Sequence, residues 1–272
     1  MTRIYDCSVD TEYAAGKRLA LSAIGRGALV VIPTDTVYGI AADAFSPEAV
    51  QKLLDAKGRD RTSPPPVLIS RIAALDALAE SVPQPVRDLV AEFWPGGLTV
   101  ILHAQPSLVW DLGETRGTVA LRMPSNPIAL ELLAETGPLA VSSANLSGLA
   151  AAVDAQGAED MLGTSVAVYL DGGVAGLAYD PIGDRPGDTS STIIDATRFD
   201  TNGGKITIVR GGVISRAAIA AVIGDALADN DTEAVPDTAE APAVESPAAA
   251  SPAHDVPMPD APEPDQGVTD TP

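Results

Sequence analysis

Short runs of apolar, largely β-branched residues alternate with segments of helical periodicity throughout residues 1–224. The runs are predicted to be strands because they are short and end at Gly, Pro or polar residues. They cover residues 28–32, 98–103, 118–123, 138–141, 166–170, 192–195 and 206–209, and helices are predicted at 11–25, 46–58, 71–80, 85–93, 126–136 and 215–223. This alternation indicates one α/β domain built around a mixed sheet.

The composition changes at Asp225. From there to Pro272 the chain has twelve acidic residues, no Lys or Arg, and recurring prolines. Such a segment cannot bury enough apolar surface to offset the entropy of ordering it. We therefore predict a folded domain over residues 1–224 and a disordered, acidic, Pro- and Ala-rich tail over 225–272.

The net charge is −20, from 37 acidic and 17 basic residues. This balance argues against attraction to nucleic acid or to an anionic membrane by bulk electrostatics, so an anionic substrate must be held by locally placed cations. One cysteine and two histidines exclude a disulfide framework and argue against a histidine or thiolate metal cluster, and no metal ligands are identified. Without a signal pattern or an apolar run of membrane-spanning length, we expect a soluble cytoplasmic protein.

Two polar segments follow the first predicted strand and the helix after it. The first is PTDTVYG at residues 33–39, where hydroxyls, a carboxylate and a phenol could bind a small polar molecule or could bond their own backbone in a turn. The second is Lys57-Gly58-Arg59, where an extended chain would turn both cations toward one anion. The cations could instead complement a helix C-terminus.

Two further features lie in later strands. In SSANLSG, residues 142–148, Ser143 and Asn145 are two apart and could project to the same side, although a polar turn is an alternative. Arg122 closes an apolar strand on the face of Thr118 and Ala120, and burial requires a partner for its charge. Binding of a carboxylate and a structural salt bridge both remain open.

The order of the motifs is more specific than any one of them. PTDTVYG, KGR, FWPGGLT, LRMP, SSANLSG, SSTIID and VRGG follow one another in a pattern that resembles the YrdC-like family of L-threonylcarbamoyladenylate synthases, over residues 10–220. The resemblance implies a twisted sheet around a concave cavity. It also implies synthesis of threonylcarbamoyl-adenylate from L-threonine, bicarbonate and ATP, with Mg²⁺ accompanying ATP and with release of pyrophosphate. A threonylcarbamoyl transferase complex acting on tRNA is the implied partner.

The resemblance also implies roles for individual residues. Lys57, Arg59, Ser143 and Asn145 would be catalytic and bind ATP together with Thr118 and Arg210, while Thr36, Arg122 and Ser191 would bind threonine. Three positions depart from some members of the family, because Leu68 stands in place of a histidine, Ser63 in place of a lysine, and Ala151 in place of a hydroxyl residue.

Three other functions are weighed against the same sequence features below by what each would require of the chain. A double-stranded RNA-binding module would use the same concave face, but the net charge argues against it. A catalytically silent paralogue is disfavoured by the presence of Lys57, Arg59, Ser143 and Asn145. A carbamoyl-transfer domain of hydrogenase maturation would carry cysteine-rich zinc modules, which one cysteine excludes.

Overall fold

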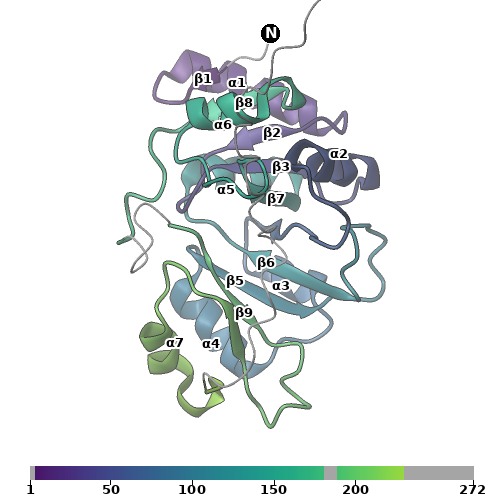
Figure 1. The fold of residues 1–272 in the computed structure, drawn as a ribbon, viewed down its shortest axis with the longest axis vertical. Coiled ribbons are helices and arrows are strands. Elements are labelled where there is room, and N and C mark those ends of the chain that lie inside the picture. Colours follow the sequence, from purple (N-terminus) through teal and green to yellow (C-terminus); the bar gives the residue numbers. More distant parts are fainter. Residues whose placement is uncertain (1–3, 181–188, 230–272) are drawn as a thin grey trace, which may run out of the picture. The chain divides into compact units, whose positions relative to one another are not determined.

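The structure is a computed structural model, which describes residues 4–180 and 189–229 (Figure 1). Ten strands form one sheet. In spatial order they are β1 (Ile4–Asp6), β8 (Val168–Asp171), β2 (Val30–Ile32), β3 (Gly39–Asp43), β7 (Leu139–Ser143), β4 (Val67–Leu68), β6 (Thr118–Arg122), β5 (Leu98–His103), β9 (Thr192–Asp195) and β10 (Thr207–Arg210). Four pairs are parallel, namely β1–β8, β8–β2, β4–β6 and β5–β9, and the other five are antiparallel. The predicted α/β domain with a mixed sheet is confirmed.

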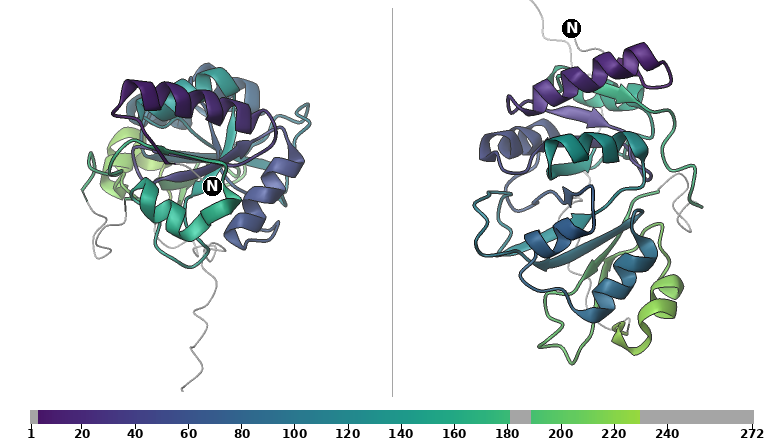
Figure 2. Two further views of the ribbon diagram at one scale, coloured as in Figure 1. Left: turned by 90° about the horizontal axis from the view of Figure 1, so that it is seen from above. Right: turned by 180° about the vertical axis from the view of Figure 1, so that it is seen from behind.

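Helices cover both faces of the β1–β8–β2–β3–β7 half of the sheet. One hydrophobic cluster joins α1 (Asp10–Ile24) and α5 (Pro127–Thr136) to Val30 and Ile32, whereas another joins α2 (Pro47–Lys57) and α6 (Ala155–Leu162) to Val31. This alternation is the two-residue period of a strand that is buried on both sides. Figure 2 shows α1 and α6 on opposite sides of the sheet.

The other half of the sheet has helices packed on one face. The helices α3 (Ala73–Leu78), α4 (Gln84–Phe93) and α7 (Arg216–Ile223) share a hydrophobic cluster with alternate residues of β5, which are Leu98, Val100 and Leu102. The intervening Thr99 and Ile101 line a cavity. Period two in β5 therefore separates the core from the cavity wall.

The seven predicted strands and six predicted helices are all present, with ends that shift by one or two residues in most cases. The end signals of α2 are confirmed, because the Ser46 side chain accepts a hydrogen bond from the Ala49 amide and Gly58 has a φ of +65°. Sequence reasoning missed β1, β3, β4 and α6. β3 reads GIAAD, whose Gly and Ala residues have low strand propensity, and β4 has two residues.

The folded part extends past the predicted boundary at residue 224. A 3₁₀ turn spans Gly224–Ala226, Leu227 is 6% exposed, and the Ala228 amide donates to the Ile206 carbonyl. Leu227 and Ala228 therefore pack with the domain a few residues beyond the predicted boundary. Residues 230–272, for which disorder was predicted, lie outside the described residues. Within the described part of the chain, no helix combines the length and the apolar character needed to cross a bilayer.

Candidate active site

A cavity of about 520 Å³ lies against β5, β6 and β9, and its wall is rich in hydroxyl and guanidinium groups. Seven of the nine residues predicted for the site line it, namely Thr36, Arg59, Thr118, Arg122, Ser143, Ser191 and Arg210. They come from six segments that are far apart in the sequence, so the fold brings them to one place. Lys57 and Asn145 are not part of the cavity wall.

Lys57 is buried behind the SSANLSG loop. It is the last residue of α2 and is 1% exposed. Its Nζ donates hydrogen bonds to the Ser143 carbonyl, the Asn145 carbonyl (2.8 Å) and Asn145 Oδ1 (3.2 Å). An ammonium has three N–H groups, and each can donate a hydrogen bond to one of these three oxygens. The expectation that Lys57 and Arg59 face one anion is wrong in this arrangement. The segment is not extended, because the Arg59 amide still donates to the Leu54 carbonyl of the helix.

The Asn145 side chain makes hydrogen bonds within the same loop and to Lys57. Its Oδ1 accepts from Lys57, and its Nδ2 donates to the carbonyls of Leu146 (3.0 Å) and Leu149 (2.6 Å). Ser143 lines the cavity and Asn145 does not, since the Asn145 side chain bonds Lys57 and the loop carbonyls instead. The predicted contacts of Lys57 and Asn145 with ATP would require these internal hydrogen bonds to be exchanged.

The position of Lys57 makes folding stability depend on pH. Burial, and then the charge of Arg59, lowers the pKa of the Lys57 ammonium from 10.5 to about 7. Between these pH values the unfolded chain binds more protons than the folded chain. The free energy of unfolding therefore rises with pH above about 7 and receives no such contribution below it.

We expect the Lys57→Met variant to lack this rise. Between pH 7 and 8.5 the free energy of unfolding of the wild type should increase by about 1.7 kcal/mol more than that of the variant, since one proton corresponds to about 1.4 kcal/mol per pH unit once the folded side chain has lost it. Urea unfolding at pH 6, 7 and 8.5 measures the difference. If the free energy of unfolding depended on pH in the same way in both proteins, the lowered pKa of Lys57 would be contradicted. At pH 8.5, where the folded Lys57 side chain is a neutral amine, the variant should also be less stable, because buried oxygens lose their donor.

Arg59 points from the end of α2 into the cavity wall. Its Nε donates to Ser147 Oγ (3.4 Å) and its Nη1 to Ser142 Oγ (3.3 Å). Ser142 and Ser143 line the cavity beside it. A guanidinium in this position can bind a phosphate oxygen, since a charge-assisted hydrogen bond to an anion is stronger than one to a neutral hydroxyl.

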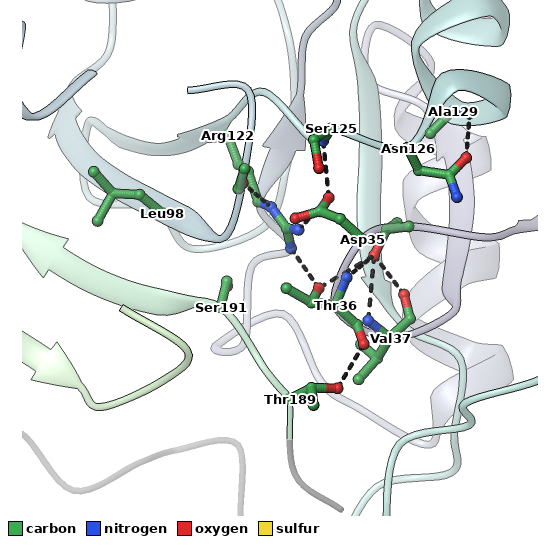
Figure 3. A network of polar contacts seen from close by, with 12 residues as sticks. Asp35, Thr36, Val37, Leu98, Arg122, Ser125, Asn126, Ala129, Thr189 and Ser191 are labelled. Carbon is green, nitrogen blue, oxygen red and sulfur yellow. Dashed lines mark hydrogen bonds and ion pairs between the residues drawn. The ribbon is translucent and has the colours of Figure 1, made fainter. Parts of the chain in front are cut away.

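Arg122 is held from several directions (Figure 3). Its Nε donates to the Gly96 carbonyl (3.0 Å), Nη1 to Thr36 Oγ1 (2.8 Å) and Nη2 to Asp35 Oδ1 (2.8 Å). The sequence left a carboxylate-binding role and a salt bridge open. The structure shows the salt bridge to Asp35 and also places Arg122 in the cavity wall.

The PTDTVYG segment forms the predicted turn and also reaches Arg122. Thr34 Oγ1 donates to the Val37 carbonyl (2.5 Å) and accepts from the Thr36 amide, as expected of a turn. Thr36 and Asp35 instead reach Arg122. The turn therefore fixes the backbone that presents these two side chains.

The remaining predicted residues lie on the β6, β9 and β10 side of the cavity. Ser191 Oγ is 2.9 Å from Thr99 Oγ1, and Arg210 Nη2 donates to both the carbonyl (2.7 Å) and Oγ (3.0 Å) of Ser191. Thr118 Oγ1 donates to the Thr115 carbonyl. Leu68 and Ser63 line the cavity, whereas Ala151 does not.

Sequence reasoning did not single out Tyr179, whose hydroxyl donates to Asp35 Oδ2, and no sequence pattern marks it.

Carboxylates are scarce in the cavity. Among the described residues that line it, Asp195 is the one acidic side chain. The described residues contain no cluster of three or more His, Cys, Asp or Glu side chains placed to hold a metal ion.

Comparison with known proteins places this geometry in context. The chain matches the model of the Sua5/YciO/YrdC family, described as telomere recombination, over residues 22–212. A relative from Mycobacterium tuberculosis strain H37Rv, provisionally named a threonylcarbamoyl-AMP synthase, is 46% identical over 224 residues, which are 82% of this chain and 96% of the relative. The threonylcarbamoyl-AMP synthase of Bacillus subtilis is 36% identical over 190 residues, 65% of this chain and 55% of that protein.

Solved structures show the same architecture. The crystal structure of Pyrococcus abyssi Sua5 complexed with L-threonine has a TM-score of 0.69 and 31% identity, covering 82% of this chain and 61% of that chain. Escherichia coli YciO has a TM-score of 0.62 at 23% identity, which supports the fold alone. The chain thus spans about three fifths of the Sua5 chain and nearly all of the mycobacterial relative.

Proposed function

Because the chain belongs to the Sua5/YciO/YrdC family, we propose that it is a threonylcarbamoyl-AMP synthase that joins L-threonine, bicarbonate and ATP into threonylcarbamoyl-adenylate and releases pyrophosphate. The observation that carries this proposal is a single cavity that contains Arg59 beside two serine hydroxyls and Arg122 beside Thr36. One guanidinium suits phosphate and the other suits a carboxylate. The names of the relatives support the synthase and give no support to an RNA-binding module or a silent paralogue.

The reaction brings two anions together. The amine nitrogen of L-threonine first bonds to the carbon of bicarbonate and water leaves, which gives N-carboxythreonine. A carboxylate oxygen of N-carboxythreonine then attacks the α-phosphorus of ATP, a new oxygen–phosphorus bond forms, and the bond to the β-phosphate breaks as pyrophosphate leaves with its electron pair. Fixed cations lower the repulsion between the reactants and stabilise the charge that develops on the leaving group. Arg59 fills this role at the triphosphate, with Arg210 and Thr118 assigned to the nucleotide. No covalent intermediate with the enzyme is needed, so positioning supplies much of the acceleration.

Threonine is assigned to Thr36, Arg122 and Ser191. Arg122 has five N–H groups and donates three of them to protein oxygens, so two are left for the substrate carboxylate. The Thr36 and Ser191 hydroxyls offer hydrogen bonds to the polar groups of the substrate. Lys57 and Asn145 act from behind the wall, where they hold the loop that presents Ser143.

We propose that Mg²⁺ enters with the triphosphate, whose oxygens are ligands that this ion prefers. Asp195 is the cavity carboxylate that could add a ligand, and the ion would supply neutralisation of phosphate charge. We further propose that the product passes to a threonylcarbamoyl transferase complex that modifies tRNA.

Substrate analogues test the threonine assignment. L-2-Aminobutyrate, which lacks the hydroxyl, should lower kcat/KM by about 10-fold or more, because the polar groups that bind the hydroxyl are left unpaired. L-Serine, which lacks a methyl group, should lose less. Pyrophosphate release with each amino acid at saturating ATP and bicarbonate measures the difference. The reverse order would contradict a site that recognises the hydroxyl.

A further inference from the structure

The acidic side chain beside Arg122 and a tyrosine from a distant loop are outside the roles assigned above. We propose that Asp35 and Tyr179 are positioning residues for the amino-acid substrate, which act by holding the Arg122 guanidinium in the orientation that receives the substrate carboxylate. This inference rests on the proposed function. Neither side chain is expected to touch threonine.

Asp35 is a buried carboxylate with three donors. Its side chain is 4% exposed and that of Arg122 is 8% exposed. Oδ1 accepts from Arg122 Nη2 (2.8 Å) and from the Ser125 amide (2.9 Å), and Oδ2 accepts from the Tyr179 hydroxyl (2.8 Å). A buried ion pair is favourable only when its geometry is good and further hydrogen bonds satisfy its remaining atoms. The Ser125 amide and Tyr179 supply those bonds, so Asp35 has one well-defined orientation.

Tyr179 supports this carboxylate from the far side of the ion pair. Burial, and then the charge of Asp35, raises the pKa of its phenol to about 12, so the hydroxyl keeps its proton and remains a donor near neutral pH. A Cβ atom added to Gly97 would lie 3.3 Å from the Tyr179 hydroxyl oxygen, so a side chain there would crowd the tyrosine. The adjacent Gly96 carbonyl accepts from Arg122 Nε. Tyr179 and the Gly96–Gly97 turn thus enclose the Asp35–Arg122 pair.

The chain of contacts runs in one direction toward the cavity. Tyr179 fixes Asp35, Asp35 and Thr36 fix the Nη atoms of Arg122, and Arg122 lines the cavity. Loss of the first contact should loosen Arg122 while leaving Arg59 and its serines unaffected. The effect should therefore appear in the binding of threonine and be absent from the binding of ATP.

The experiment measures the Kd of L-threonine and of ATP by calorimetry, with thermal unfolding, for the full chain and its variants. Tyr179→Phe keeps the ring and removes one hydrogen bond, and should raise the Kd of threonine about 3- to 10-fold. Asp35→Asn removes the charge and should raise it about 30-fold or more. The double variant should equal Asp35→Asn alone, because Tyr179 acts through Asp35. The Kd of ATP should stay within about 2-fold of the wild type.

Tyr13→Phe is the matched control. Tyr13 also donates to a carboxylate, that of Glu131, but at an exposed position outside the cavity wall, so no affinity should change. If Asp35→Asn does not fold, the threonine affinity of Tyr179→Phe alone tests the inference. Unchanged threonine affinity in Tyr179→Phe, or equal losses for threonine and ATP together with a lower melting temperature, would overturn the inference while the proposed function stands. A wild type that binds ATP but not threonine would overturn both.

Discussion

Replacement of Arg59 by alanine is expected to lower kcat/KM for ATP by about 100-fold or more while the melting temperature stays close to that of the wild type. Removal of one donor from developing charge has effects of this size in other enzymes. The fold should tolerate the change, because Arg59 lies in the cavity wall and its hydrogen bonds to two serine hydroxyls are long, at 3.3 and 3.4 Å. Arg59→Lys should also lose most of the activity, since an ammonium cannot reproduce the planar fork of donors.

Arg61→Ala provides the matched control for Arg59. Arg61 lies two residues further along, pairs with Asp111 at the surface and does not line the cavity. Its removal should leave ATP turnover unchanged, since exposed ion pairs contribute little. Steady-state rates of pyrophosphate release for the three variants give the comparison. Near-normal rates for Arg59→Ala and Arg59→Lys would show that the KGR segment is only a helix terminus.

Local signals account for the parts of the fold that the sequence predicted. Ser46, Pro47 and Gly58 mark both ends of α2 because capping and left-handed backbone depend on adjacent residues. The strands β5 and β9 are found because β-branched residues fill them. The strands β3 and β4 carry no such signal. Their neighbours in the sheet hold them in place, and β4 pairs with β6 and β7, which lie more than 50 residues away.

The candidate site shows the same division. The order of the motifs identified seven residues that line one cavity. The direction of Lys57 could not be read from its spacing to Arg59, because its three acceptors belong to a loop 86 and 88 residues further along the chain. The Asp35–Tyr179 bond joins residues 144 apart, and neither the turn around Asp35 nor the composition around Tyr179 indicates it. Whether a polar side chain points into the cavity or supports its wall depends on tertiary contacts, and the local sequence does not reveal those contacts.

Arg122 is an intermediate case. Its place in an apolar strand correctly indicated that its charge needs a partner. The partner, Asp35, belongs to a motif that the sequence had already singled out, but the sequence could not show that the two segments meet. The ion pair uses one of the five N–H groups of the guanidinium, so the salt bridge does not exclude the proposed binding role.

The central claim is that this cavity activates ATP only for a nucleophile made from threonine and bicarbonate. Release of pyrophosphate from labelled ATP, with one component omitted at a time in the presence of magnesium, tests this claim most directly. We expect release with all components present and a rate at least about 100-fold lower when L-threonine or bicarbonate is omitted, because the attacking carboxylate then does not exist. Release that is independent of threonine, or no release under any combination, would contradict the claim.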